Sequence, residues 1–286
     1  MLYFMRAVIA VTIAALSGCG PVDMLNATVP MDGVQVWRDV AYAPGPRLAM
    51  DVYAPRERTQ ALPMVVFFYG GSWQTGARWD YRFAAASLAK RGMVVVVPDY
   101  RLYPEVQFPA FVEDAAKAVA AARARAGEWG GDPKRLVLMG HSAGAHIAAL
   151  LALDPRYLAA AGDSRDHVAG FVGMAGPYDF LPITGAKIKL VFAPANNDLS
   201  QTQPVNFADA AAPPSLLLHG LQDLTVLPRN SEALATRLER AGAAVTLKEY
   251  GSLAHIGIIT ALTSLFAGRA PVLEDVVGFV MAVGPR

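Results

Sequence analysis

The sequence predicts an α/β fold with a largely parallel sheet. Two apolar runs, Val94–Val97 and Leu136–Met139, show no polar alternation, which is typical of strands buried on both faces. Alanine-rich stretches with helical character, Tyr81–Arg91 and Phe111–Ala126, precede these runs. A glycine-flanked turn, Gly140–Gly144, then joins the second run to a helical segment. Strands and helices that alternate in this way form β-α-β units, whose strands pair in parallel.

The rest of the chain fits a single domain. With 286 residues and 54% hydrophobic content, it can bury one large core, and no linker or internal repeat interrupts it. An antiparallel pair is predicted within Gln35–Ala54, because Pro44-Gly45-Pro46 divides this segment. Further strands are predicted at Val168–Met174, Pro214–Leu218 and Val245–Tyr250, and a terminal helix at Leu273–Ala282.

The turn Gly140–Gly144 reads Gly-His-Ser-Ala-Gly, which is typical of a nucleophile elbow. At the apex of such a turn, Ser142 has strained backbone geometry and an exposed hydroxyl. Gly140 and Gly144 lack a Cβ, so the strand and the helix can approach closely. The N–H of Ala143 lies at the helix N-terminus, where it can meet an oxyanion. The sequence therefore predicts Ser142 as a nucleophile, and an ordinary tight turn is the alternative.

A serine nucleophile requires a histidine base and a carboxylate, which follow an elbow serine in the order Ser, Asp, His. Asp223 follows the buried run Pro214–Leu218 and is expected in the loop past its carboxyl end, where functional residues of open α/β sheets lie. His255 follows the run Val245–Tyr250 and is also expected in a loop. We therefore predict that Asp223 orients His255 and that His255 acts as the base.

Other histidines and acids fit these roles less well. His219 precedes Asp223 in the same segment, which breaks the expected order, and we expect it to pack in a turn. Three further histidines and two further acids are expected to be structural, solvated or turn-capping. They are His141, His146, His167, Asp179 and Asp198.

A second oxyanion donor is expected from the loop after the apolar run Pro63–Phe68. This loop begins with Tyr-Gly-Gly-Ser-Trp at residues 69–73, and its adjacent glycines let backbone N–H groups converge. Gly71 and Ser72 are predicted to donate alongside Ala143, with Trp73 as a wall of the acyl pocket. A Gly-Gly turn beside a core tryptophan is the alternative.

Residues 69–73, 98–102 (Pro-Asp-Tyr-Arg-Leu) and 140–144, with Asp223 and His255, together resemble the α/β-hydrolase carboxylesterases. They are most similar to the hormone-sensitive-lipase-like and kynurenine-formamidase-like branches. The resemblance covers residues 34–283 and implies an eight-stranded, mostly parallel sheet with an antiparallel start, helices on both faces and a small cap. In those families a histidine that supports the oxyanion loop stands where this chain has tyrosine at position 69. This departure bears on loop geometry and substrate range.

Composition argues against several other functions. The net charge is +1, from 25 basic and 24 acidic residues, so nothing favours binding to nucleic acid or to a strongly anionic substrate. One cysteine and five scattered histidines offer no metal-ligand spacing, and no phosphate loop or dinucleotide fingerprint is present. We predict a small-molecule ester substrate, with no metal and no cofactor.

The N-terminus resembles a bacterial lipoprotein signal. Arg6 precedes the apolar run Ala7–Leu16, which continues as Ser-Gly-Cys19 and is shorter than the roughly 20 residues that span a bilayer. The resemblance implies a signal peptide at 1–18, a lipidated Cys19, an envelope tether at 19–33 and a catalytic domain at 34–286. Gly20 then favours the outer membrane of a Gram-negative host. A cleaved secretory signal, which gives a periplasmic or secreted protein, is the alternative.

Together these features predict a serine hydrolase that cleaves carboxylic esters through an acyl-enzyme. The segment Pro177–Pro213, with an amphipathic stretch at Ile183–Phe192, is the main material that can cover the site. Because this cap is light, we expect short acyl groups, acetyl to butyryl. An amide or formamide hydrolase with the same three residues is one alternative. A non-catalytic envelope binding protein is another, for which Tyr69 is the one indication.

Overall fold

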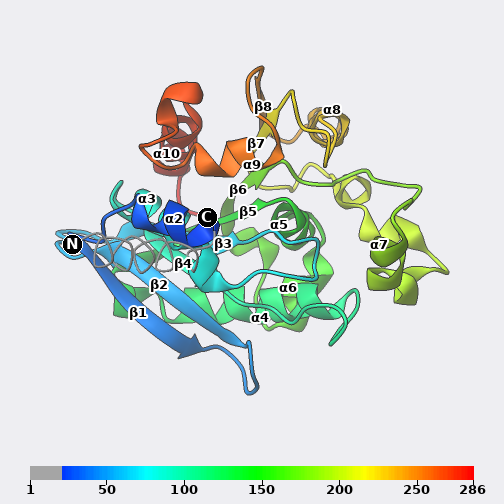
Figure 1. Cartoon of the computed structure of the whole chain (residues 1–286). Coiled ribbons are helices and arrows are strands. Elements are labelled where there is room, and N and C mark those ends of the chain that lie inside the picture. Colours follow the sequence, from blue (N-terminus) through cyan, green and yellow to red (C-terminus); the bar gives the residue numbers. More distant parts are fainter. Residues whose placement is uncertain (1–20) are drawn as a thin grey trace, which may run out of the picture.

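The computed structural model describes residues 21–286 and contains an eight-stranded sheet in the order β1-β2-β4-β3-β5-β6-β7-β8 (Figure 1). The pairs β1–β2 and β2–β4 are antiparallel, whereas the remaining neighbours pair in parallel. The predicted fold class is therefore confirmed. The strands are β1 (Val34–Ala41), β2 (Ala49–Pro55), β3 (Leu62–Phe68), β4 (Val94–Pro98), β5 (Gly131–His141), β6 (Val168–Met174), β7 (Ser215–Gly220) and β8 (Val245–Tyr250).

Helices cover both faces of this sheet. α3 and α10 lie on one side, and α4, α5, α6 and α8 lie on the other (Figure 1). The α-helices of the described range are α2 (Pro21–Ala27), α3 (Arg82–Ala89), α4 (Ala110–Ala124), α5 (Ala143–Leu153), α6 (Pro155–Ala160), α7 (Ala186–Val191), α8 (Arg229–Ala241), α9 (His255–Thr260) and α10 (Val272–Ala282). Short 3-10 helices are η1 (Arg78–Tyr81), η2 (Ala126–Trp129), η3 (Arg165–His167), η4 (Ala193–Ala195), η5 (Leu199–Thr202), η6 (Pro204–Phe207) and η7 (Ala267–Arg269).

The core lies on both sides of the central strands. The side chains of Val94–Val97 in β4 and Leu136–Met139 in β5 are buried, as the lack of polar alternation predicted. β6 and β8 have the predicted bounds, but β5 begins five residues before the apolar run Leu136–Met139. The reason is that Leu62 of β3 pairs with Gly131, which extends the strand beyond its apolar part.

Two predicted loop positions are wrong. His219 belongs to β7, whose pairing with β8 continues to its end. His255 is the first residue of α9 rather than a loop residue. Both residues still lie where the chain leaves the carboxyl end of a strand, so the corrections do not move them away from the same edge of the sheet.

Part of the predicted tether belongs to the fold. Residues 21–27 form α2, which packs against η1 and α3. The side chain of Asn26 accepts a hydrogen bond from the N–H of Phe83 at 2.9 Å and donates to the carbonyl of Trp79 at 3.1 Å. The predicted signal peptide and Cys19 lie outside the described residues. Within residues 21–286, no helix combines the length and apolarity needed for a membrane span.

Candidate active site

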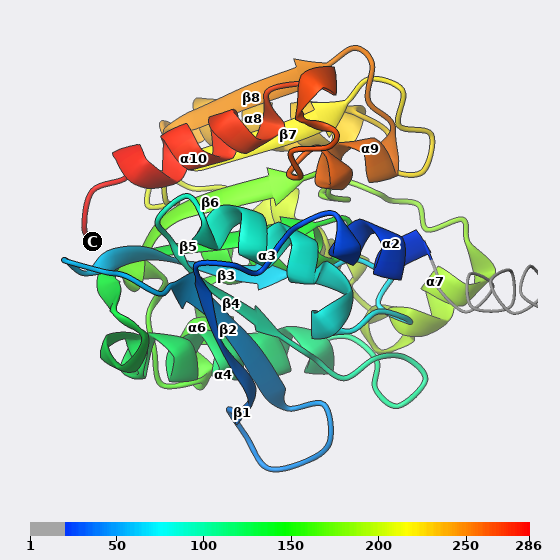
Figure 2. The ribbon, with the colours of Figure 1, turned by 60° about the vertical axis from the view of Figure 1, so that its left-hand side comes forward.

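The register of the sheet brings the carboxyl ends of the parallel strands to one edge. Phe68 at the end of β3 pairs with Gly140, and Met174 at the end of β6 pairs with both His141 and Leu218. Functional residues of open α/β sheets lie beyond such an edge. The loops after β3, β5, β7 and β8, which carry the predicted site residues, all leave the sheet there (Figure 2).

Ser142 lies between β5 and α5 in the strained conformation that an elbow requires. Its φ of 55° and ψ of −123° are rare for a residue with a side chain, and its N–H donates to Met174 at 2.9 Å. The flanking glycines permit this turn: a Cβ on Gly140 would lie 2.3 Å from the carbonyl oxygen of Gly144, and one on Gly144 would lie 2.0 Å from that of Phe68. The backbone contacts therefore demand glycine at both positions.

The three residues predicted to act together are joined by hydrogen bonds. Nε2 of His255 lies 2.9 Å from Oγ of Ser142, and Nδ1 lies 2.7 Å from Oδ2 of Asp223. Because a carboxylate only accepts, Nδ1 carries the proton and Nε2 is free to accept the serine proton. The structure thus joins the three residues in the spatial order Ser142, His255, Asp223.

Asp223 is held rigidly in the loop between β7 and α8. Its Oδ1 accepts hydrogen bonds from the N–H groups of Thr225 at 2.8 Å and Val226 at 2.9 Å, and the residue is 1% exposed. Oδ2 therefore remains for His255. A carboxylate fixed by two backbone donors holds its partner imidazole in one orientation.

His219 supports this loop from β7, as a structural rather than a reacting residue. Its Nε2 lies 2.8 Å from the carbonyl of Val226 and 3.4 Å from Oδ2 of Asp223, while Nδ1 lies 2.7 Å from Oγ of Ser231. The carbonyl can only accept, so Nε2 carries the proton and Nδ1 accepts from the serine. Burial lowers the pKa of His219, which keeps it neutral.

His141 packs directly against His255 and was missed by sequence reasoning as a contributor to the site. Its Nε2 donates to the carbonyl of His255 at 3.0 Å, and the two rings lie 4.9 Å apart. Burial, together with the neighbouring His255, lowers the pKa of His141 to about 3. His141 is therefore a neutral donor that fixes the backbone from which His255 projects. Its position inside the elbow was the available signal.

The other residues considered for these roles lie elsewhere. Asp179 is exposed, and its N–H donates to the side chain of Asn230. Asp198 caps η5 by accepting from the N–H of Ser200 at 3.2 Å, the turn-capping role expected for it. His167 contacts Asp163 at 2.6 Å.

A cavity of about 320 Å³ opens beside Ser142. Pro177, Phe180, Ile183 and Ile188 of the predicted covering segment line it, so this segment forms a wall of the site. Trp73 also lines the cavity and packs against Phe180 with ring centroids 6.2 Å apart. The surroundings of the serine hydroxyl are thus mostly apolar.

Of the predicted oxyanion donors, Ser72 and Ala143 line this cavity together with Ser142. Gly71 lies in the adjoining turn, where its carbonyl accepts from the N–H groups of Gln74 and Thr75 at 3.0 Å each. Its φ is +125°, and a Cβ there would lie 2.1 Å from the carbonyl oxygen of Thr75. Glycine is therefore required at position 71 by the turn itself.

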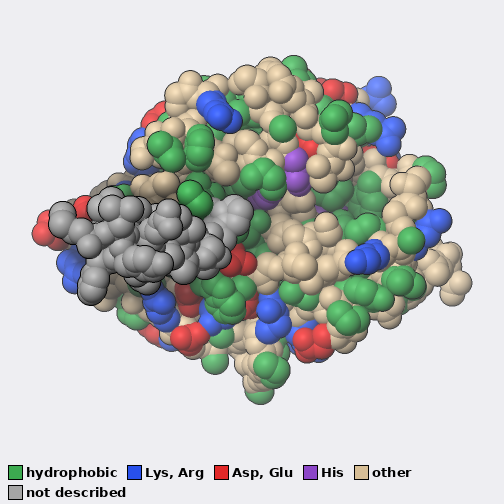
Figure 3. Space-filling view, viewed as in Figure 1, with side chains coloured by type: hydrophobic (Ala, Val, Ile, Leu, Met, Phe, Trp, Pro, Cys, Tyr) green, Lys and Arg blue, Asp and Glu red, His purple; other side chains and the backbone are tan. Residues whose placement is uncertain are grey.

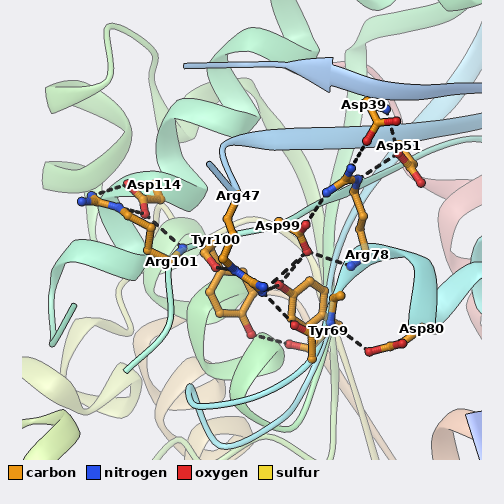
Figure 4. A network of polar contacts seen from close by, with 12 residues as sticks. Asp39, Arg47, Asp51, Tyr69, Arg78, Asp80, Asp99, Tyr100, Arg101 and Asp114 are labelled. Atoms are coloured by element: carbon orange, nitrogen blue, oxygen red, sulfur yellow. Dashed lines mark hydrogen bonds and ion pairs between the residues drawn. The ribbon is translucent and has the colours of Figure 1, made fainter. Parts of the chain in front are cut away.

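Tyr69 stands at the start of this loop and joins it to a buried charge network (Figure 4). Its hydroxyl donates to Oδ1 of Asp99 at 2.8 Å and accepts from Nη2 of Arg47 at 3.0 Å. Arg47 also donates to the carbonyl of Gly76 at 2.7 Å, and the guanidinium of Arg78 pairs with Asp99. Asp99 belongs to the Pro-Asp-Tyr-Arg-Leu motif, but nothing in the sequence marked Arg47. The loop is thus held at Tyr69 and at Gly76 by hydrogen bonds to the same group of charged side chains.

Replacing Tyr69 by Phe is expected to lower the free energy of unfolding by about 1–3 kcal/mol, because it leaves the buried Asp99 and the partly buried Arg47 each without one partner. Urea unfolding measures this change. Tyr42→Phe is the matched control: its hydroxyl donates to the backbone carbonyl of Asp99 at a partly exposed position, so the loss is expected to be smaller, about 0.5–1.5 kcal/mol. Equal losses in the two variants would contradict this role of Tyr69.

His146 on α5 makes stability depend on pH. Its Nε2 donates to the carbonyl of Thr202 at 2.8 Å, its ring contacts Trp73 edge-on at 5.1 Å, and burial lowers its pKa to about 4. In the unfolded chain the same group takes up a proton near pH 6.5. The unfolded state therefore binds more protons between these two values, and the free energy of unfolding must fall as the pH is lowered from 6.5 towards 4.

His146→Phe is expected to reduce the stability lost between pH 7.5 and pH 4.5 by about 2–3 kcal/mol, because phenylalanine has no proton to gain. Urea unfolding at the two pH values measures the difference, and the aromatic neighbours accommodate the new ring. A residual dependence of the same sign is expected from His141 and His219, whose pKa values are also lowered. An unchanged pH dependence would show that His146 contributes none of it.

The described residues hold no cluster of three or more histidine, cysteine or acidic side chains arranged to bind a metal ion. The reactive groups that the structure brings together at the site are the serine hydroxyl, the imidazole and the carboxylate.

Comparison with known proteins agrees with the resemblance in the sequence. A protein of Oryza sativa subsp. japonica named probable isoprenylcysteine alpha-carbonyl methylesterase is 30% identical over 267 residues, 87% of this chain and 64% of that protein. Kynurenine formamidase of Danio rerio is 29% identical over 245 residues, 80% of this chain and 77% of that protein. The chain thus spans less than two thirds of the length of the first relative.

A solved structure, a hyperthermophilic esterase from the archaeon Pyrobaculum calidifontis, is 25% identical with a TM-score of 0.73 and covers 92% of this chain and 91% of its own. The family model described as BD-FAE matches residues 50–238, which include β2 to β7 and the elbow. The eight-stranded sheet with helices on both faces is accordingly an α/β-hydrolase fold, and the chain belongs to the BD-FAE family.

Proposed function

We propose that this protein is a carboxylic ester hydrolase in which Ser142, His255 and Asp223 form a catalytic triad. The hydrogen-bonded chain from Oγ of Ser142 through His255 to Asp223 carries the proposal. Two relatives and a neighbouring structure named for ester or formamide hydrolysis support it.

In the proposed reaction, Nε2 of His255 takes the proton of Ser142 while Oγ attacks the ester carbonyl carbon. The N–H groups of Ser72 and Ala143, with that of Gly71, donate to the oxyanion of the tetrahedral intermediate. The intermediate collapses when His255 returns the proton to the leaving alcohol, which gives an acyl-enzyme. Water then attacks the acyl carbon by the same steps and releases the acid and Ser142.

The cavity beside Ser142 supports a preference for short acyl groups. It measures about 320 Å³, and Trp73, Phe180, Ile183 and Ile188 are among its lining side chains. Rates on nitrophenyl acetate, butyrate and palmitate test the preference, with kcat/KM expected to be highest for acetate or butyrate. A maximum on palmitate would overturn the chain-length proposal and leave the esterase proposal intact.

Hydrolysis of a formamide is the second candidate, since a kynurenine formamidase matches most of this chain. The same triad serves both reactions, and they differ in that the leaving nitrogen must be protonated as the C–N bond breaks. Formylkynurenine assayed beside nitrophenyl acetate separates the two. Turnover of the formamide with a kcat/KM above that of the ester would replace the first proposal by the second.

A further inference from the structure

Exposed apolar side chains of the described residues gather near the edge of the sheet that carries the site. Apart from Met281 on α10, they lie on α2 or in segments that follow the carboxyl ends of β3, β6, β7 and β8. We call this set the apolar rim. It consists of Val22, Met24, Trp79, Leu181, Leu190, Leu221, Leu224, Leu227, Ile256 and Leu265. Single exposed apolar residues are ordinary, but a concentration on one side of a protein indicates an interaction surface.

Part of the apolar rim forms a continuous groove between α2 and the segment from α9 to η7. This groove has a volume of about 430 Å³. Its lining side chains are Val22, Met24, Leu25, Thr28, Ile256, Thr260, Leu265 and Phe266, none of which is charged. Ile256 follows His255 directly, so the groove lies beside the candidate active site. Figure 2 shows α2, α9 and α7 together at the end to which the parallel strands point, and Figure 3 shows hydrophobic side chains on that face.

The position of α2 in the chain favours a lipid bilayer as the occupant of this groove. The described chain begins with α2, and Cys19, the predicted site of lipidation, stands three residues before Val22. Three extended residues span at most about 11 Å. If Cys19 is lipidated, as the sequence predicts, its acyl chains would enter a bilayer within that distance of Val22 in the groove. An anchor at this distance would bring the apolar side chains of the groove against the same bilayer surface.

We propose that the apolar rim rests in the interface of a lipid bilayer, with the groove between α2 and α9 at the contact. The mouth of the cavity beside Ser142 then faces the lipid, and an ester dissolved in the bilayer reaches it without crossing bulk water. This consequence for the substrate rests on the proposed esterase function, whereas the membrane contact does not.

The fluorescence of Trp79 can be used to measure the contact with the bilayer. Trp79 is 55% exposed within the apolar rim, whereas Trp73 and Trp129 are 4% and 1% exposed and Trp37 is a partly buried residue of β1. The full chain, expressed so that its N-terminus is processed, is reconstituted into phosphatidylcholine vesicles with and without bromine on the lipid acyl chains. Brominated lipid is expected to quench a large part of the Trp79 emission, and Trp79→Phe is expected to abolish that part.

A matched pair of variants separates the contact from the anchor. Met24→Asp combined with Leu265→Asp places two charges on the groove and is expected to remove most of the quenching while the protein stays on the vesicles. Met281→Asp adds a charge to an exposed apolar position on α10, outside the rim, and is expected to leave quenching unchanged. Rates on soluble nitrophenyl acetate are expected to be the same in all three proteins.

Three results would overturn the membrane contact. The first is a lack of quenching in the unsubstituted protein, and the second is equal quenching in Met24→Asp/Leu265→Asp and in Met281→Asp. The third is a dimer that forms in the absence of vesicles and that the double substitution Met24→Asp/Leu265→Asp dissociates. The last result would assign the groove to a second copy of the chain. Loss of the proposed esterase function is distinguishable, because an inactive protein that is still quenched by brominated lipid retains the contact.

Discussion

Replacing Ser142 by Ala is expected to lower kcat by about five to six orders of magnitude, because no other group replaces the attacking oxygen. The backbone at this position has a φ of 55°, a strain that serine and alanine share, so the fold is expected to persist. Steady-state hydrolysis of nitrophenyl acetate measures the activity, and circular dichroism with thermal unfolding measures the fold.

Ser252→Ala is the matched control for this substitution. Ser252 is an exposed serine in the segment between β8 and α9, on the same edge of the sheet, and its hydroxyl donates to the carbonyl of Arg269 at 3.3 Å. Its replacement is expected to leave kcat unchanged. An organophosphonate is expected to label the unsubstituted protein and Ser252→Ala but not Ser142→Ala. Ser142→Ala with substantial turnover would reject the assignment of the nucleophile.

Asp223→Asn is expected to lower kcat by about 10⁴-fold with little change in the fold. The carboxylate accepts from two backbone N–H groups on one oxygen and from His255 on the other. If the amide nitrogen faces His255, Nδ1 must accept and the proton moves to Nε2, where it can no longer accept from Ser142. If the amide turns around, its NH₂ group confronts the N–H groups of Thr225 and Val226. The first orientation removes the base, and the second sets N–H groups against each other and leaves the protonated imidazole without a charged partner.

Substitution of the exposed Asp179 by Asn is the matched control for Asp223→Asn. Asp179→Asn is expected to retain full activity, because the Asp179 carboxylate is not part of the chain that joins Ser142 to Asp223. Comparing kcat/KM of the two variants against pH from 5 to 9 checks both. If Asp179→Asn were the impaired variant and Asp223→Asn the active one, the orienting carboxylate would have to be reassigned.

Much of the site could be predicted because its signals are local. The elbow is encoded by a strand, two glycines and a helix within a few residues, and the close contacts of Gly140 and Gly144 show why no other residue fits. Asp223 and His255 follow buried strands, and parallel strands end at a common edge, so their meeting follows from topology alone.

Other features depend on contacts between segments that are distant in the sequence. His141 donates to the carbonyl of His255, 114 positions away, and Arg47 from the first hairpin meets Tyr69. His219 belongs to β7 because its pairing with β8 continues, which the apolar pattern of a single strand does not show. Such contacts leave no periodic pattern in the sequence, and no motif in the chain indicates them.

The sequence by itself determined the α/β class, the elbow and the identity of the three residues that meet at it, because each of these follows from short patterns and from the order of strands. The tertiary structure alone decided that α2 packs on the domain, that Tyr69 joins the loop to Asp99 and Arg47, and that the exposed apolar side chains gather beside the site. These depend on which surfaces are buried against each other, a property of the packed chain rather than of any segment.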